Sequence, residues 1–220
     1  MLASELISPD FPVLSLEDRL DKAINILHEH CVFHVPVITG NGFEGLLPID
    51  LIIGNSDSNK PVSDFKNDFI HVFAYMDQHG LDIFEIMARH DLTSIPVLDM
   101  EQRYVGSISL NVLMTKLSNF YSFKTVGGII ILKVGIRDYN LAEISRIVES
   151  NNAKLLILYM DTNEENDMYH ITIKVDTADL SHILATFERY QYEILFSYPS
   201  TLQKSQLQDR YDFLMKMFEL

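Results

Sequence analysis

Apolar residues recur with two different spacings in the first part of the chain. Over residues 16–27 they follow the period of an amphipathic helix, and the run "CVFHVPVI" at residues 31–38 is typical of a short buried strand. The same succession returns over residues 81–88 and then as "DLTSIPVL" at residues 91–98. The pattern predicts two copies of one unit, each built as helix, strand, turn, strand and short helix.

Each copy places a Pro-Val pair inside its first predicted strand, at Pro36 and at Pro96. Proline donates no ladder hydrogen bond, so such a strand lies at an edge or leaves that backbone position open. Downstream of the prolines, Gly45 aligns with Gly106 once one extra residue in the second copy is allowed for. A polar, turn-rich stretch at residues 54–61 separates the copies. The two prolines therefore mark equivalent positions in a repeat.

From residue 125 onward the pattern changes to strands and helices in the order βαββαβ, the split βαβ arrangement. The expected strands are residues 126–136, 153–161, 168–176 and 192–198, and the expected helices are residues 141–151 and 179–190. Beyond Pro199 one helical stripe collects the apolar side chains Leu207, Tyr211, Leu214, Met215 and Phe218. The polar side of this helix is mixed in charge, so we expect it to dock on the body or on a second subunit rather than on a membrane.

Composition narrows the possible partners. The 220 residues are 47% hydrophobic and carry a net charge of −14, and residues 1–120 alone hold 7 basic and 17 acidic side chains. A chain this acidic is repelled by phosphate backbones and anionic lipids, so we expect no nucleic-acid partner and no membrane partner. The single cysteine, Cys31, allows no internal disulfide, and the start "MLASEL" lacks a basic signal region. We expect a cytoplasmic protein.

The repeated motif has a known counterpart. A hydrophobic–x–x–hydrophobic–Pro–Val segment, then a turn and hydrophobic–Gly–hydrophobic–hydrophobic, occurs as "HVPVI…FEGLL" and "SIPVL…YVGSI". This pattern resembles the cystathionine-β-synthase (CBS) domain. The resemblance implies two β-α-β-β-α units packed sheet to sheet, with clefts that commonly bind adenosine-containing ligands. By position, it assigns to the clefts Val32, Phe33, His34, Pro36, Leu92, Thr93, Ser94 and Pro96.

The ribose-binding part of the CBS motif is altered in both copies. The family places Ser or Thr three residues after the glycine and Asp three further on. In the first copy Pro48 takes the hydroxyl position and Asp50 comes one residue early; in the second, Ser109 is present but Val112 follows Asn111 where Asp is expected. A carboxylate hydrogen bond is worth about 1.5–3 kcal/mol. We therefore favour AMP or an adenosyl compound over a triphosphate, with Asp50, Ser109 and Asn111 as further candidates and no required cofactor.

The second half, with "IRDYNLAEI" at its first turn, resembles an ACT domain, a regulatory module that often binds amino acids and pairs in dimers. The resemblance places ligand contacts at Asp138, Tyr139 and Asn140. The family has Pro-Gly in this turn, whereas here Asn140 can instead cap the helix, with Glu143 three residues on. A CBS pair followed by an ACT-like domain resembles the bacterial acetoin-utilisation regulatory protein family. The expected α+β chain divides into CBS repeats at 1–58 and 59–122, an ACT-like domain at 123–200 and a terminal helix at 201–220.

Other candidate chemistry in the sequence is weak. The stretch "HEHCVFH" at residues 28–34 is rich in metal-ligand types, but its members fall on different sides of a helix end and on the next strand. The acidic residues 161–167 lack the glycine and terminal glutamate of a calcium loop and are typical of a hairpin tip. Ser94 with His90 or His34 suggests a triad, yet no nucleophile elbow is present. We expect neither a metal site nor catalysis.

Two functional hypotheses remain. The first is a non-enzymatic, homodimeric regulatory protein that senses a small adenosine-containing ligand in the CBS clefts and passes the signal to a partner protein through its ACT-like domain. The second is a protein-interaction scaffold whose CBS and ACT ligand sites have degenerated. Ligand binding by the purified protein separates the two.

Overall fold

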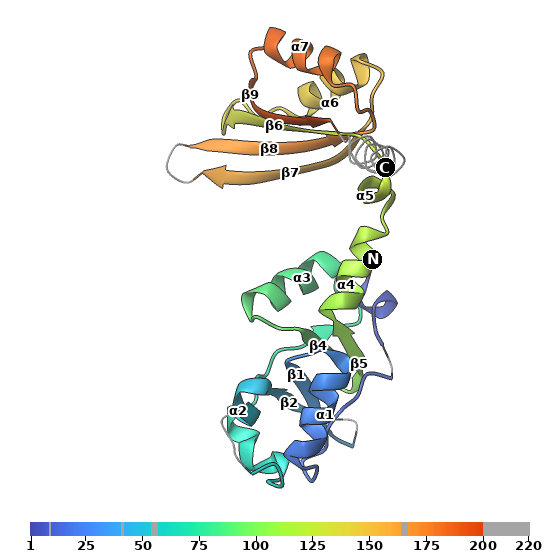
Figure 1. The fold of residues 1–220 in the computed structure, drawn as a ribbon, viewed down its shortest axis with the longest axis vertical. Helices are drawn as coiled ribbons and strands as arrows, with labels where there is room; N and C mark the ends of the chain where they lie inside the picture. The colour runs from blue at the N-terminus through green and yellow to red at the C-terminus, as the bar shows by residue number, and fades with distance from the viewer. Residues whose placement is uncertain (9, 41, 54–56, 164–166, 200–220) are drawn as a thin grey trace, which may run out of the picture. The chain divides into compact units, whose positions relative to one another are not determined.

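A computed structural model describes the chain except for residues 9, 41, 54–56, 164–166 and 200–220 (Figure 1). It divides into two compact units, Met1–Asn119 and a second that begins at Phe120. Within the described residues, no helix is long and apolar enough to cross a bilayer. The predicted terminal stripe, from Leu207 to Phe218, lies outside the described residues.

The first unit contains the predicted repeat. The first copy comprises α1 (Leu20–His30), β1 (His34–Thr39), β2 (Gly42–Pro48) and α2 (Ile49–Ile53). The second comprises β3 (Ala74–Tyr75), α3 (Gly80–Arg89), β4 (Ser94–Leu98), β5 (Tyr104–Ser109) and α4 (Leu110–Ser118). Two 3₁₀ helices, η1 (Ala3–Glu5) and η2 (Val62–Asp68), each precede one copy. The expected β-α-β-β-α order is complete in the second copy; in the first, an isolated parallel bridge from Leu14 to Val37 takes the place of the leading strand.

In each hairpin, the strand that contains the proline also pairs with a parallel segment on its other side. Leu14 donates its N–H to the carbonyl of Pro36 at 2.9 Å and accepts from the N–H of Ile38 at 2.8 Å. This bridge uses only the carbonyl of the proline, so the missing N–H leaves the bridge intact. A parallel neighbour also lies beside the second proline strand, where Ala74 pairs with Val97.

Both hairpins carry a register shift at the same place. In β1 it falls after Val37, which pairs with Gly45, and in β4 after Val97, which pairs with Gly106. The two glycines have φ of 149° and 156°, a region that residues with a Cβ rarely adopt. The repeated glycine is therefore required by the bulge itself.

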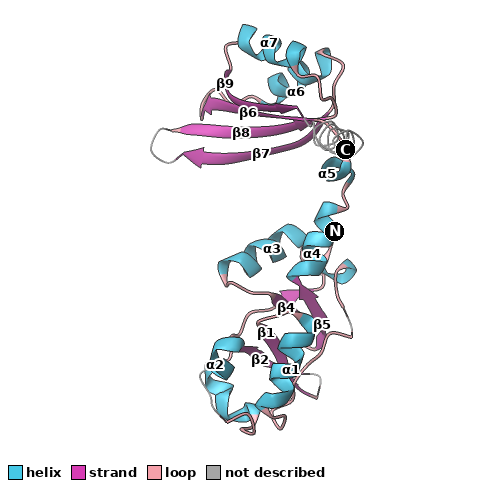
Figure 2. Ribbon diagram, viewed as in Figure 1, coloured by secondary structure: helices cyan, strands magenta, loops and turns pink. Residues whose placement is uncertain are grey.

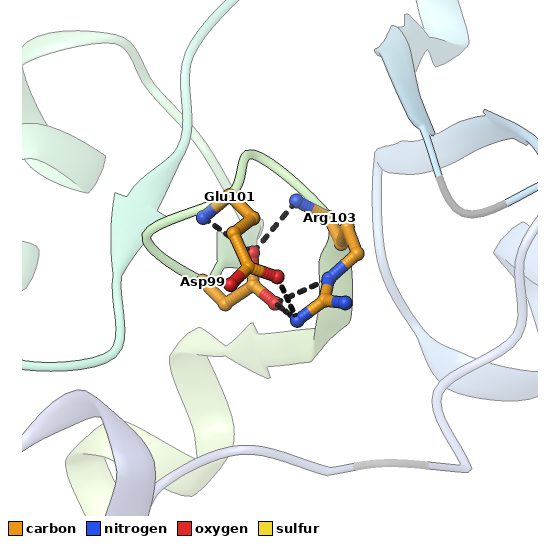
Figure 3. A network of polar contacts seen from close by, with 3 residues as sticks. All are labelled: Asp99, Glu101 and Arg103. Carbon is orange, nitrogen blue, oxygen red and sulfur yellow. Dashed lines mark hydrogen bonds and ion pairs between the residues drawn. The ribbon is translucent and has the colours of Figure 1, made fainter.

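The turns that close the hairpins differ. The first turn contains Gly40 with φ of 62°. The second is held by Asp99, whose carboxylate accepts from the backbone N–H groups of Glu101 and Arg103, each at 2.9 Å, and from the Arg103 guanidinium at 2.7 Å (Figure 3). The carboxylate of Glu101 pairs with the same guanidinium. The backbone N–H of Arg103, with its guanidinium, lowers the pKa of Asp99. The second turn is thus held by a carboxylate side chain, whereas the first depends on the backbone freedom of a glycine.

The segments that precede the two copies are exchanged. Ala3 and Leu6 lie in the core of the second copy, and Ser8 pairs with Ser107 of β5. In the same way Val62 and Phe65 of η2 lie in the core of the first copy. The segment that precedes each copy in the sequence, which we call its arm, therefore packs into the core of the other copy. Periodicity in the sequence does not reveal this connection.

The second unit contains a four-stranded antiparallel sheet, and the two longer helices of the unit lie on one face of that sheet (Figure 2). Its elements are α5 (Tyr121–Lys124), β6 (Gly128–Gly135), α6 (Leu141–Ser150), β7 (Leu155–Asn163), β8 (Met168–Val175), α7 (Ser181–Arg189) and β9 (Glu193–Pro199). The strand order is β7-β8-β6-β9, which is the split βαβ arrangement. Residues 164–166 of the predicted hairpin tip lie outside the described residues, while the flanking strands β7 and β8 pair antiparallel.

Candidate ligand site at the junction of the two repeats

The starts of the two proline strands meet, one from each copy. The backbone N–H of Phe33 donates to the hydroxyl oxygen of Thr93 at 2.7 Å, and the Ser94 hydroxyl donates to the backbone carbonyl of His34 at 2.7 Å. Ser94 is fully buried and His34 nearly so. Four of the predicted cleft residues, equivalent in pairs, are thus brought together at the junction.

His34 is the titratable group at this junction. Its Nδ1 lies 3.4 Å from both the backbone nitrogen and the hydroxyl oxygen of Thr93. Because the backbone N–H can only donate, Nδ1 acts as the acceptor, and the proton of the neutral ring is assigned to Nε2. Burial lowers the pKa of His34, while the carboxylates of Asp50 and Asp91 partly oppose this shift. The junction therefore favours a neutral imidazole.

The two helices that follow the hairpins begin at the same junction. The N–H of Ile49 donates to the carbonyl of Phe33 at 2.8 Å, and the N–H of Leu110 donates to the carbonyl of Thr93 at 2.9 Å. Asp50 and Asn111 are the next residues, so they occupy equivalent positions at the start of α2 and α4. Both side chains are exposed. The carboxylate of Asp50 thus stands in the first copy where the second has an amide.

The remaining predicted cleft residues have packing or capping roles. Val32 and Leu92 are buried, and their N–H groups close the preceding helices on Leu27 at 3.3 Å and Met87 at 2.8 Å. Pro36 and Pro96 are also buried. The Ser109 hydroxyl accepts from the N–H of Val112 at 3.3 Å and caps α4. Of these residues only Ser109 has a polar side chain, and its hydroxyl accepts the capping bond and keeps a proton that it can donate.

The candidate triad has a different arrangement from a nucleophile and its base. The Ser94 hydroxyl donates to the backbone carbonyl of His34, and the ring contacts Thr93 instead. A hydroxyl directed at a carbonyl is not activated by a base. Among the described residues, no group of three or more His, Cys, Asp or Glu side chains is arranged to hold a metal ion.

An apolar cavity adjoins the junction on the helix side of the first copy. It measures about 270 Å³ and lies between α1 and α2. Its lining residues are Ile24, Leu27, His28, Val32, Phe33, Ile49, Ile52 and Ile53. Phe33 is 54% exposed and Ile53 74% exposed, although both are large and apolar. The sequence pattern did not single out this cavity, because α2 is too short for its apolar face to be recognised by period.

In the second unit the predicted ACT-like turn is used mainly for structure. The Asn140 side-chain oxygen accepts from the N–H of Glu143 at 3.2 Å, which confirms the predicted helix cap. Tyr139 packs against Tyr169 edge to face, with ring centres 6.0 Å apart. Of the three turn candidates, Asp138 borders a cavity of about 390 Å³.

Four of the polar residues around that cavity are paired with one another. The Lys133 ammonium lies 3.1 Å from the Glu193 carboxylate, and the Tyr192 hydroxyl donates to the Glu143 carboxylate at 2.9 Å. Burial, the hydrogen bond and the charge of Glu143 raise the pKa of Tyr192 to about 12. A ligand in this cavity would have to compete with bonds already made.

Comparison with known families settles the identity of the repeat. The profile of the CBS domain matches residues 3–54 and 62–119, which together make half of the chain. The chain belongs to the CBS-domain family. The matched ranges contain both proline strands and both altered ribose motifs, so this is a tandem CBS pair, as the sequence predicts.

More distant similarities cover the same share of the chain. A curated relative, homoserine O-acetyltransferase of Methanosarcina acetivorans, is 24% identical over 115 residues. The match covers 50% of this chain and 20% of the length of that relative. A CBS domain pair/ACT domain protein from Thermotoga maritima is 18% identical with a TM-score of 0.48, and the match covers 53% of this chain and 96% of that one. The CBS domain of a bacterial CNNM/CorC family Mg²⁺ transporter, solved with ATP, is 15% identical with a TM-score of 0.44, over 53% and 87% of the two chains.

Proposed function

We propose that this chain is a non-enzymatic regulatory sensor that binds an adenosine-containing ligand at the junction of its CBS repeats. The observation that carries the proposal is the meeting of Phe33 and His34 with Thr93 and Ser94, while the nearby Asp50 carboxylate influences the His34 ring. A ligand that bridges these residues would alter contacts that join the two copies. Binding and the relative packing of the repeats would then be coupled.

The charges around the junction favour a ligand with few phosphates. Asp50 and Asp91 both act on His34, and the first 120 residues carry ten more acidic than basic side chains. Like charges repel, and each added phosphate raises that cost. An adenosine moiety needs hydrogen-bond partners for its base and a carboxylate for its ribose. We therefore expect AMP or an adenosyl compound to bind more tightly than ATP.

The test is a calorimetric and thermal-shift comparison of adenosine, AMP, ATP and S-adenosylmethionine. A ligand at 100 times its dissociation constant should stabilise the protein by about 2.7 kcal/mol. No shift with any of the four at millimolar concentration contradicts the proposal.

The equivalent positions Asp50 and Asn111 provide matched variants. Loss of a carboxylate hydrogen bond of about 1.5–3 kcal/mol corresponds to at least tenfold weaker binding, so Asp50→Asn should lower affinity by that factor. Asn111→Asp alters the charge at the same point of the other copy and should leave binding at the Asp50 position intact. Equal affinity of Asp50→Asn and the unmodified protein would remove Asp50 from the site.

We further propose that the second unit is of the ACT type and that the protein acts as a homodimer on a protein partner. The strand order β7-β8-β6-β9 and the helix start at Asn140 support the domain type. The combination of a CBS pair with this unit supports the resemblance to acetoin-utilisation regulators. Sedimentation analysis of the purified chain tests the dimer, and a thermal-shift screen of amino acids tests Asp138 and its cavity.

One observation favours the alternative, a protein-interaction scaffold. The polar groups of the junction already bond to one another, through Thr93, Ser94 and His34, and the cavity beside them is apolar. A scaffold of this kind predicts no response to any adenosine compound. It also predicts that charge placed at the exposed Ile53 abolishes the recovery of a partner while the fold is retained.

A further inference from the structure

The apolar cavity between α1 and α2 lies within the first CBS copy. Its described lining residues come from α1, from α2 and from the segment that leads into β1. Three of them, Leu27, Val32 and Ile52, are buried members of the core of that copy. Ile53, another lining residue, is exposed. The cavity is therefore a gap in the packing of one core that reaches the surface between two helices.

The volume of the cavity suits a small molecule. It measures about 270 Å³, and an apolar cavity of about 150 Å³ already holds benzene. Pockets for drug-sized ligands measure about 300–1,000 Å³. The space therefore fits a molecule of one or two rings, or a branched chain of similar size.

The lining of the cavity indicates an uncharged ligand. None of the described lining residues carries a carboxylate, ammonium or guanidinium group, and among them His28 alone has a polar side-chain group. A charged ligand would lose its water here without gaining an opposite charge. The exposed His28 ring makes no hydrogen bond to another described residue. Because a neutral imidazole both donates and accepts, it can bind one polar group of a ligand.

The second copy has different side chains at the equivalent positions. Two apolar lining positions have larger residues there, and the aromatic and imidazole positions have smaller ones. The corresponding pairs are Ile24 and Phe84, Val32 and Leu92, Phe33 and Thr93, and His28 and Ala88. The side chains that form the cavity thus belong to the first copy and are not a general feature of the repeat.

One lining residue of the cavity also bonds at the junction of the two copies. The N–H of Phe33 donates to the Thr93 hydroxyl oxygen at 2.7 Å. The carbonyl of Phe33 accepts from the N–H of Ile49, another lining residue, at 2.8 Å. An occupant that contacts Phe33 therefore touches a residue that is bonded both to α2 and to the second copy.

We propose that this cavity binds a small uncharged molecule with an aromatic or branched apolar body and one hydrogen-bonding group. The apolar body fills the space between the helices and covers Phe33 and Ile53, which are 54% and 74% exposed. Removal of this apolar surface from water supplies the affinity, and His28 binds the polar group. The inference does not rest on the adenosine site, because Asp50 and Thr93 are not among the described lining residues.

Titration of the full-length chain with indole tests the proposal. Indole is neutral, has two fused rings and carries one N–H donor. We expect a dissociation constant of about 1 mM or lower, since small apolar fragments bind efficiently for their size. Indole-5-carboxylate has the same rings and a negative charge, and it should bind at least tenfold more weakly. Equal binding of the two compounds, or no binding of indole, overturns the proposal.

A substitution taken from the second copy should close the cavity. Ile24→Phe introduces the side chain of Phe84 at the equivalent position of α1 and should weaken indole binding at least tenfold. Ile136→Phe makes the same change at a side chain 44% exposed in the second unit and should leave binding unchanged. Indole binding that survives in Ile24→Phe contradicts the site.

Methyl NMR of the isoleucines in the unmodified chain decides the matter if Ile24→Phe fails to fold. Indole should shift the methyl signals of Ile24, Ile49 and Ile52 and leave the signal of Ile136 in place. Shifts of equal size at Ile136 would mean non-specific binding and would overturn the proposal.

Competition experiments separate the cavity from other occupants. Indole affinity should be the same with and without adenosine, and a loss of affinity in adenosine would place both ligands in one space. Indole affinity should also be independent of protein concentration. A decrease as the protein concentration rises would mean that a second copy fills the cavity. Either result overturns the proposal, whereas failure of adenosine to bind at all leaves the indole result standing.

Discussion

The two CBS repeats share a backbone and differ in the side chains that would meet a ligand. Both close their first long helix on a left-handed residue, Cys31 and Asp91, each with φ of 52°. Both have a bulge opposite a glycine, and both begin the following helix on a carbonyl at the junction. Yet His34 in one copy corresponds to Ser94 in the other. The two copies therefore share one backbone arrangement but present different side chains at the junction.

The same asymmetry appears at the helix starts. Asp50 carries a charge where Asn111 carries none, and the pKa of His34 responds to that charge. A symmetric pair would offer two equal sites. Here the first copy supplies the imidazole and the carboxylate, and the second supplies the two hydroxyls of Thr93 and Ser94. We therefore expect the two clefts to differ in affinity.

The largest effect should come from breaking the arm exchange. Leu6 is 1% exposed in the core of the second copy, so Leu6→Ala removes buried contacts and should lower the free energy of unfolding by about 2–4 kcal/mol. Urea denaturation measures the loss, and hydrogen exchange should show it in the second copy first. Leu2→Ala in the same arm, at a side chain 43% exposed, is the control. Faster hydrogen exchange in the first copy alone would contradict the packing of this segment in the second copy.

The bulge glycine is expected to have the next largest effect. A Cβ on Gly45 would lie 2.6 Å from the Cβ of Phe69, at φ of 149°. Gly45→Ala should therefore destabilise the first unit by about 1–3 kcal/mol through strain and overlap. Gly42→Ala is the matched control, since the nearest atom is 3.5 Å away and is an ordinary contact. Equal denaturation midpoints for the two variants would show that the bulge does not require glycine.

An effect of similar size is expected from the loss of one hydrogen bond across the junction. Ser94→Ala leaves the buried His34 carbonyl without its hydroxyl donor and should cost about 1–3 kcal/mol. Ser118→Ala removes the same type of bond, from a hydroxyl to the carbonyl of Thr115 at 2.9 Å, at an exposed site. Thermal unfolding of both variants measures the difference. A loss no greater than that of the exposed control would mean that the junction contributes little to stability.

The smallest expected effect is the pH response of His34. Burial places the folded-state pKa below the ordinary value of 6.5, so the unfolded chain binds this proton more readily. Stability should therefore fall as the pH drops below about 6.5, until the folded-state pKa is passed. His34→Asn should flatten this slope in denaturation measured from pH 7.5 to 5, whereas His28→Asn, at an exposed side chain, should not. An unchanged slope in His34→Asn would contradict the assignment.

Features set by neighbouring residues were predictable from the sequence. The hydrophobic period located the helices and the proline strands, and the cap at Asn140 needs only the N–H three residues later. The glycines opposite the bulges were visible as a repeated position, Gly45 and Gly106. The hydrophobic pattern also predicted strands β6 to β9 in their order along the chain. The alternation of apolar and polar residues along a strand depends only on which face of that strand is buried.

The repeat, its CBS motif and the order of elements follow from the sequence alone, since these depend on local period and on residues a few positions apart. The folded structure was needed to show that Leu6 lies in the core of the second copy, that Phe65 lies in the core of the first, and that the His34 ring contacts Thr93 and not a catalytic serine. These contacts join residues far apart in the sequence, by 59 positions in the case of His34 and Thr93. They follow from the packing of two cores against each other, where the buried apolar area of the whole unit, and not any local pattern, selects the partners.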